Sequence, residues 1–308
     1  MARENKGKRG KRKRGEMGNG KSKGENMKKY FKCEENTIVN FSGGRTSGFL
    51  LYKLLQSYGG NLPDNFKVLF QNTGKEFPET LDFVKQCADS WRVNIIWLEY
   101  AKPTHKNERG HWVYPNGMAC KVVNYETASR NGEPFEDLIS IYSGLPNLKQ
   151  RWCTTMLKQK VAHHYAMKCL NWEEWQSYIG IRYDEPSRWR ARGVNPRLKR
   201  EIRELPLVDA KITAEDVNYF WSNKAGFNVN LPRGVSNCDL CFLKGNNKKR
   251  QLIRKNPRLA DWWLRMEEQK GVYFRNDSTY KALRETAIRS PELPIFDNED
   301  IACTSCTD

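Results

Sequence analysis

The sequence predicts an α/β protein with a doubly wound, mostly parallel Rossmann-like sheet and a helical, cysteine-containing C-terminal region. Between residues 37 and 98, short apolar runs alternate with longer segments whose apolar side chains recur at helical spacing. This β-α-β-α-β succession implies parallel strands joined by right-handed crossovers. Ligands of such sheets bind beyond the carboxyl ends of the strands, so we expect a site near Ser42 and Asn72.

The expected elements follow in order along the chain. Strands are expected at residues 37–41, 66–71 and 93–98, and near 178–182. Helices are expected at residues 48–58, 78–91, 154–169, 214–223, 258–269 and 278–288. Pro78 suits a first helical turn, where its missing N–H is not needed. Residues 101–133 are polar and contain scattered Gly, Pro and Asn, so we expect an inserted active-site loop or subdomain there.

Charge and composition divide the chain further. The 308 residues carry a net charge of +17, and residues 1–29 supply 12 basic against 3 acidic side chains, which is +9. This segment lacks Val, Ile, Leu and aromatic residues, so we expect a disordered basic tail. Such a tail can bind nucleic-acid phosphates, and a solubilising tail is the alternative. We expect an α/β domain over 30–210 and a helical region over 211–308.

The sequence shows no apolar stretch long enough to span a membrane and no signal-peptide core. We therefore expect a cytoplasmic protein with no membrane partner, in a compartment where thiols stay reduced. The nine cysteines are then expected to be ligands, nucleophiles or ordinary buried residues rather than disulfides.

A glycine-containing turn follows the first expected strand. Residues 42–47 read Ser-Gly-Gly-Arg-Thr-Ser and lead into a helix. The glycines let the backbone approach a ligand closely, while the first helical N–H groups and the hydroxyls favour an anion. A phosphate fits this turn, and an ordinary structural turn is the alternative reading. The second strand is followed by Asn72, Thr73 and Gly74, which should face the same cleft.

Several motifs occur in an order that resembles the phosphoadenosine phosphosulfate reductase-like family of ATP-pyrophosphatase-loop proteins. They are the Ser-Gly-Gly turn, the Asn-Thr-Gly-Lys-Glu-Phe-Pro-Glu-Thr run at 72–80, Arg-Trp-Cys at 151–153 with Lys158, Gly-Ile-Arg-Tyr-Asp-Glu at 180–185, and Pro-Leu-Val-Asp at 206–209 leading to Glu-Asp-Val at 215–217. The resemblance covers residues 37–245 and is to the branch found in bacteriophages and mobile elements, which would place the protein in a host cytoplasm. This branch is similar to DNA-phosphorothioation sulfurtransferases.

The resemblance implies an ATP site, with Mg²⁺ as a further cofactor. Thr46 stands where adenylating members of the family carry aspartate. The arginine of the Gly-Ile-Arg motif would contact the nucleotide. The nucleotide-binding candidates are Ser42, Gly43, Gly44, Arg45, Thr46, Ser47, Asn72, Thr73, Gly74 and Arg182.

Cysteines form the second candidate site. Cys238 and Cys241 have the spacing that lets two thiolates reach one soft metal. Cys153 lies where iron–sulfur reductases of the family place a cysteine pair. The resemblance therefore implies a [4Fe–4S] cluster held by Cys153, Cys238, Cys241 and a fourth ligand, with structural zinc as the alternative. Cys306 is the first choice for that ligand, followed by Cys303 and Cys120.

Basic side chains gather after the Gly-Ile-Arg motif. Arginines can grip phosphates, and the nearby Trp189 can stack on a base, so this stretch predicts a nucleic-acid contact. The candidates are Arg188, Arg190, Arg192 and Arg200. A second basic run over 244–258 is either a similar contact or a solvated helical face.

The expected function is an ATP-binding iron–sulfur sulfurtransferase that modifies nucleic acid or a nucleotide through an adenylated intermediate. One alternative is a phosphoadenosine phosphosulfate reductase that releases sulfite, with Cys306 as the nucleophile. The other is a non-catalytic nucleic-acid-binding subunit. A sulfur donor or a partner subunit is expected for the first, and no single catalytic residue is assigned for it.

Overall fold

The computed structural model describes residues 29–195, 198–232, 235 and 238–289. Its main sheet contains seven strands in the order β6-β3-β2-β1-β7-β9-β8. Their bounds are β1 Thr37–Asn40, β2 Phe66–Asn72, β3 Ile95–Tyr100, β6 Cys120–Val123, β7 Trp175–Ile179, β8 Gly193–Asn195 and β9 Leu198–Glu204. The neighbours from β3 to β9 pair in parallel, whereas β6 and β8 are antiparallel edge strands. The mostly parallel α/β fold expected from the sequence is confirmed.

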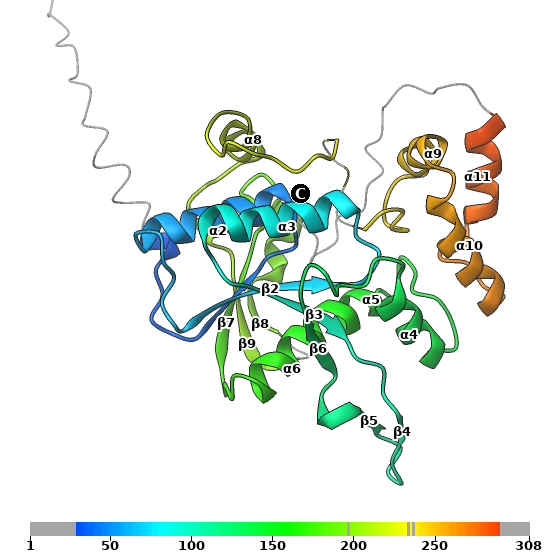
Figure 1. The fold of residues 1–308 in the computed structure, drawn as a ribbon, viewed down its shortest axis with the longest axis horizontal. Coiled ribbons are helices and arrows are strands. Elements are labelled where there is room, and N and C mark those ends of the chain that lie inside the picture. Colours follow the sequence, from blue (N-terminus) through cyan, green and yellow to red (C-terminus); the bar gives the residue numbers. More distant parts are fainter. Residues whose placement is uncertain (1–28, 196–197, 233–234, 236–237, 290–308) are drawn as a thin grey trace, which may run out of the picture.

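Helices cover both faces of the sheet (Figure 1). One face carries α2 (Arg45–Ser57), α3 (Pro78–Trp91) and α8 (Ala214–Asn223), whose apolar residues share a buried cluster with the sheet. The other face carries α4 (Glu133–Ile141), the short α5 (Trp152–Thr154), the π-helical turn η3 (Thr155–Gln159) and α6 (Lys160–Lys168). Short helical segments are η1 (Lys29–Phe31), η2 (Pro115–Gly117), η4 (Pro186–Ala191) and α7 (Pro206–Asp209).

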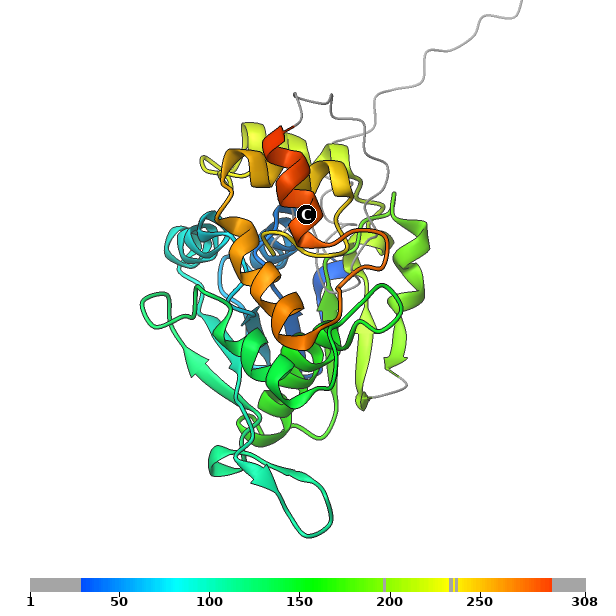
Figure 2. The ribbon, with the colours of Figure 1, turned by 90° about the vertical axis from the view of Figure 1, so that its right-hand side faces the viewer.

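The helical C-terminal region consists of α9 (Asn246–Lys255), α10 (Leu259–Lys270) and α11 (Tyr280–Arg289). Figure 2 shows these helices beside the α4 and α5 side of the molecule. Leu138 of α4, Leu157 of η3 and Trp263 of α10 belong to one buried cluster. The C-terminal helices therefore share a core with the α/β part, which brings the segment containing Cys238 and Cys241 up to the sheet.

Several boundaries differ from the sequence-based expectation. Helix α2 begins at Arg45 rather than at residue 48, because Gly43 turns the chain with φ +78° and Gly44 already caps the helix. Strand β3 begins two positions later than expected, since the backbone N–H groups of Arg92 and Val93 still cap α3. Strand β7 spans Trp175–Ile179, earlier than expected, so that Gly180 packs against the backbone of Ser47.

The insertion contains more regular structure than a loop. A small hairpin of β4 (His105–Lys106) and β5 (Trp112–Val113) extends from the body (Figure 1), and β6 adds an edge strand to the sheet. Strands β8 and β9 were not expected, because β8 has only three residues and β9 is mostly charged, so neither gives an apolar strand pattern. Among the described residues, no helix has the length and apolar character needed to cross a membrane.

Candidate functional site

The turn between β1 and α2 is built to bring backbone close to a ligand. A side chain at Gly43 would be strained at φ +78°, and its Cβ would lie 2.6 Å from Thr80 Cγ2. The Ser42 and Ser47 hydroxyl oxygens lie 3.0 Å apart, and Ser47 Oγ donates to Gly44 O over 3.0 Å. The N-terminal N–H groups of α2 follow directly, so the turn has the form of an anion site at a helix start.

Two arginines at this turn have different roles. Arg182 Nη1 donates to Thr46 Oγ1 over 2.9 Å, and Arg182 Nε lies 3.1 Å from Asp184 Oδ1. The predicted nucleotide contact is thus beside the turn. Arg45 instead donates to Asn228 Oδ1 and to the carbonyls of residues 229 and 231. Its side chain ties α2 to that distant segment, which differs from the nucleotide contact expected of it.

The segment after β2 is held by buried polar contacts. Asn72 is fully buried and donates to Glu99 Oε1 over 2.6 Å, while its own Oδ1 accepts from the Gly74 N–H over 3.1 Å. Thr73 donates through its N–H and its hydroxyl to the Glu76 carboxylate at 2.8 to 3.0 Å. Asn72 therefore shapes the second loop, and Thr73 and Gly74 form its tight turn.

Three of the four candidate cysteines within the described residues meet at one cavity of about 30 Å³. Cys153 comes from α5, whereas Cys238 and Cys241 come from the segment before α9. Cys238 Sγ lies 3.8 Å from Glu76 Oε1 and 4.0 Å from Thr73 Oγ1. The remaining lining residues are Thr73, Phe135, Thr154, Leu157, Lys158, Phe242, Leu243 and Trp263. The cysteine pocket thus adjoins the second loop.

A buried ion pair fixes the Cys238–Cys241 turn against that loop. Lys75 Nζ lies 2.8 Å from Asp239 Oδ2, and both side chains are less than a tenth exposed. Asp239 N donates to Lys75 O, and Trp263 Nε1 donates to Asp239 Oδ1, both over 2.8 Å. Sequence reasoning did not assign Lys75 or Asp239, although both lie inside motifs that it used. The position of each residue inside such a motif was the one sequence signal that could have marked it as part of the site.

The thiols do not form a metal centre as placed. Within the described ranges, no group of three or more His, Cys, Asp or Glu side chains is arranged to hold a metal ion. Cys120 is buried in β6, where burial raises the pKa of its thiol to about 12, and it does not line the cysteine pocket. Cys303 and Cys306 lie outside the described residues. The donor chemistry suits a soft metal, but no cluster site is shown.

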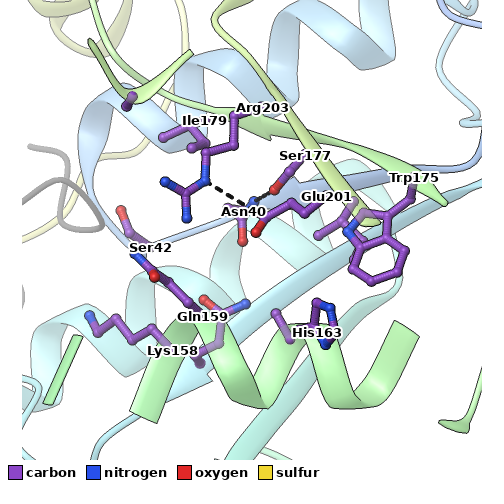
Figure 3. Close-up of a pocket in the computed structure, with 14 residues that line it drawn as sticks. Asn40, Ser42, Lys158, Gln159, His163, Trp175, Ser177, Ile179, Glu201 and Arg203 are labelled. Atoms are coloured by element: carbon purple, nitrogen blue, oxygen red, sulfur yellow. Dashed lines mark hydrogen bonds and ion pairs between the residues drawn. The ribbon is translucent and has the colours of Figure 1, made fainter. Parts of the chain in front are cut away.

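A second cavity, the polar chamber, lies between the sheet and α6 (Figure 3). Asn40, Ser177, Glu201 and Arg203 face it from the strands, and Lys158, Gln159 and His163 face it from η3 and α6. Ser42 and Gln71 also line it, next to the first turn, together with Ile38, Ala162, Trp175, Ile179 and Ala191.

Lys158 connects the two cavities. It lines both the polar chamber and the cysteine pocket, and its Nζ lies 3.8 Å from Glu76 Oε1. Its side chain belongs to the π-helical turn η3. Such turns are frequent at functional sites, and this one places a buried ammonium between the chamber and the thiols.

The predicted nucleic-acid arginines differ in exposure. Arg188 is buried, with Nη1 2.5 Å from Glu185 Oε1, so it does not present its guanidinium on the surface as expected. Arg192 lies 2.7 Å from Asp209 Oδ2. Arg190 and Arg200 are exposed. Their guanidinium groups are placed as a surface contact requires, whereas Arg192 is exposed but paired with Asp209.

Comparison with known proteins places the chain in a protein family. A model of the phosphoadenosine phosphosulfate reductase domain matches residues 36–225. An uncharacterized nin region protein of Escherichia phage lambda is 27% identical over 212 residues, covering 68% of this chain and 67% of that protein. An uncharacterized protein of Methanocaldococcus jannaschii is 24% identical over 244 residues; the match covers 76% of this chain and 42% of the relative's length.

Solved structures were compared as well. The crystal structure of phosphoadenylyl-sulfate reductase from Candida auris in a phosphate complex is 14% identical, with a TM-score of 0.37, and the match covers 64% of this chain and 78% of that one.

Proposed function

This chain belongs to the phosphoadenosine phosphosulfate reductase domain family, and we propose that it is an ATP-dependent sulfurtransferase that acts on nucleic acid or a nucleotide. The family is one of nucleotide-related sulfur-transfer and reduction enzymes. The observation that carries the proposal is the convergence of Cys153, Cys238 and Cys241 on one pocket beside the second loop. Thiols that come from two separate segments and meet at one pocket are suited to handling sulfur or to binding a soft metal.

Nucleotide binding is assigned to the first turn. Backbone N–H groups at the start of α2 and the hydroxyls of Ser42 and Ser47 would stabilise phosphate charge. Arg182 is already held at the turn by Thr46 and Asp184, so its guanidinium is oriented before a ligand arrives. An acceptor oxygen would attack the α-phosphate of ATP and release pyrophosphate. A hydrosulfide-level sulfur nucleophile would then displace AMP from the adenylated acceptor.

The cysteine pocket would handle the sulfur. Its thiols are suitable ligands for an iron–sulfur cluster, or for zinc, but they are not grouped as a metal site within the described residues, so no step is assigned to a metal. Lys158 would supply positive charge beside anionic sulfur. The exposed Arg190 and Arg200 support a nucleic-acid acceptor.

The test is transfer of radiolabelled sulfur from sulfide to an oligonucleotide in the presence of ATP and Mg²⁺, under anaerobic conditions with iron and zinc analysis. We expect labelled product and AMP, and a loss of labelling of at least about a hundredfold in Cys238→Ser. Cys169→Ser is the matched control because Cys169 is exposed and does not line the pocket. Unchanged labelling in Cys238→Ser would refute the role of the pocket.

The family match also favours a second candidate, reduction of phosphoadenosine phosphosulfate with release of sulfite. Its proposed nucleophile, Cys306, lies outside the described residues. Incubation with that sulfonucleotide and reduced thioredoxin distinguishes the two, since sulfite would appear only in the reductase case.

A further inference from the structure

We propose that the β4–β5 hairpin, residues 104–113, is a contact for duplex DNA and that it enters the major groove. This contact does not depend on sulfur transfer. Its further role, to hold the DNA that accepts the sulfur, rests on the proposed function and narrows the acceptor to a duplex.

The hairpin extends away from the rest of the protein. Residues 104–112 are all exposed, and both ribbon views show the two strands leaving the sheet and its helices (Figures 1 and 2). An isolated two-stranded hairpin is only marginally stable in water. Contacts within the hairpin must therefore hold it in shape.

Hydrogen bonds order the tip of the hairpin. Asn107 N donates to His111 O over 2.9 Å, and Gly110 N donates to Asn107 O over 2.8 Å. The side-chain oxygen of Asn107 accepts from the backbone N–H groups of Arg109, over 3.1 Å, and His111, over 2.9 Å. Arg109 thus lies exposed at the end of an ordered turn, so a partner would lose little conformational freedom in binding it.

The exposed side chains favour a partner rich in hydrogen-bond acceptors. Lys106 pairs with Trp112 across the hairpin, and its Nζ lies 4.7 Å from the ring centroid. Glu108 is the one acidic residue in the hairpin, and residues 104–112 include no aliphatic side chain. The hairpin therefore lacks the apolar core of a protein interface. Phosphates and base edges of nucleic acid accept hydrogen bonds, and the side chains that can donate them are Lys106, Asn107, Arg109, His111 and Trp112.

The dimensions of the hairpin select the groove. Its strands lie about 4.8 Å apart, and about five residues on each side give it a reach of roughly 17 Å. The major groove of B-form DNA is about 12 Å wide and about 8.5 Å deep, and it admits a two-stranded ribbon. Arg109 at the tip would reach a guanine edge, and Lys106 would lie near the phosphates. The major groove of duplex RNA is too narrow for such an element.

The root of the hairpin is attached to an element of the candidate site. Lys102 Nζ lies 3.5 Å from Asp137 Oδ1 of α4, and Phe135 of the same helix lines the cysteine pocket. Figure 2 shows the hairpin extending from the edge of the face that carries α4 and the C-terminal helices. DNA held by the hairpin would lie along this side of the protein, and the net charge of +17 would attract it.

The test measures binding of the full chain to a short fluorescent DNA duplex by fluorescence anisotropy at several salt concentrations. We expect Arg109→Ala to bind a guanine-containing duplex about fivefold more weakly, or worse, because a base contact is lost. Lys106→Ala should lower the salt slope by about one, because a phosphate contact is lost. Equal affinities of the wild type and Arg109→Ala would overturn the contact.

Glu108→Gln is the matched control, since it changes the exposed neighbour of Arg109 in the same turn. This variant should bind DNA as tightly as the wild type or more tightly, because a negative charge is removed. All three variants should keep the melting temperature of the wild type, since the changed side chains lie outside the core. If Glu108→Gln weakened binding as much as Arg109→Ala, the proposed contact would be wrong.

Duplex RNA and single-stranded DNA test whether the groove matters. The basic residues 1–29 are kept in every variant, and contacts with phosphates alone do not depend on groove shape. A loss of affinity in Arg109→Ala that is confined to duplex DNA supports the groove contact. An equal loss with duplex RNA or single-stranded DNA would overturn it.

Two outcomes separate this inference from the proposed function. Sulfur transfer by a protein in which Arg109→Ala binds duplex DNA as tightly as the wild type would reject the hairpin contact and leave the proposed function standing. Weaker duplex binding by Arg109→Ala in a protein that transfers no sulfur would support the contact and reject the proposed function.

Discussion

Two turns of the candidate site, at residues 42–47 and at residues 238–241, are held in place by different kinds of contact. The turn at residues 42–47 depends on local backbone geometry and on hydroxyl contacts such as Ser42 with Ser47. The Cys238–Cys241 turn depends on the buried pair of Lys75 and Asp239, which joins segments far apart in the chain. The backbone path of the nucleotide turn is therefore set largely within residues 42–47, although Arg182 also contacts it. The turn that carries Cys238 and Cys241 forms only when the C-terminal region docks on the α/β part.

Breaking the buried ion pair should have the largest effect. Asp239→Asn leaves Lys75 as an uncompensated buried charge, so we expect the free energy of unfolding to fall by about 3–5 kcal/mol, measured by urea denaturation. The control is Asp89→Asn, since Lys85 and Asp89 lie at the same 2.8 Å but on the surface. That variant should lose only about 0.3–0.5 kcal/mol.

If both variants lost the same free energy of unfolding, the Lys75–Asp239 pair would not be what holds the Cys238–Cys241 turn in place. A second measurement keeps the test independent of global stability. The Cys238 and Cys241 thiols should react faster with a thiol reagent in Asp239→Asn at temperatures where most molecules remain folded, because the turn is released first.

Strain in the first turn should have the next largest effect. Gly43→Ala places a side chain at φ +78° and brings its Cβ to 2.6 Å from Thr80 Cγ2. We expect a loss of about 2–4 kcal/mol from the backbone strain and the overpacking together, measured by thermal unfolding. Gly59→Ala is the control, because its φ is +70° but nothing lies within 4 Å of the added Cβ.

The control should therefore lose only about 1–2 kcal/mol, the backbone part of the effect. If both alanine variants lose the same amount, the close approach of Gly43 to α3 has no energetic consequence. Weaker ATP binding by Gly43→Ala, and not by Gly59→Ala, would also support the assignment of this turn to phosphate.

The same contrast explains what could be predicted from the sequence. The first turn and α3 were predictable because strand, glycines and helix are adjacent, so local conformation decides them. The convergence of Cys153 with Cys238 was expected only from the family resemblance. The Lys75–Asp239 pair was not foreseen, since sequence alone gives no distance between such residues.

Strand β9 shows a different limit. Its charged residues suggested a surface, and Arg200 is indeed exposed. Glu201 and Arg203, however, lie two positions apart on one face of the strand and point into the polar chamber. A buried polar layer breaks the apolar pattern on which strand prediction relies, so the feature that makes the chamber chemically interesting also concealed the strand.

The smallest expected effect comes from a lysine near the cysteine pocket that packs over the Tyr280 ring, with Nζ 5.5 Å from the ring centroid, and that has, among the described residues, no close carboxylate like the one that pairs with Lys75. Lys249 of α9 is fully buried, and its Nζ makes no hydrogen bond to the described residues. Burial lowers its pKa to about 8, opposed by the nearby Asp277 and Glu267 and reinforced by Arg275. We expect Lys249→Met to raise the free energy of unfolding by about 1–3 kcal/mol at pH 7, because an unsatisfied buried charge is removed.

This gain should shrink as the pH rises from about 8 toward the normal lysine pKa of 10.5. In that interval the unfolded wild type binds a proton that its folded form has lost, so the stability of the wild type increases with pH while the variant lacks this term. Urea denaturation of both proteins at several pH values measures the difference. If the difference in the free energy of unfolding between the two proteins stays constant across this pH range, Lys249 keeps its charge in the folded state. A buried lysine beside the cysteine pocket would then remain charged without a carboxylate as close as the one that pairs with Lys75.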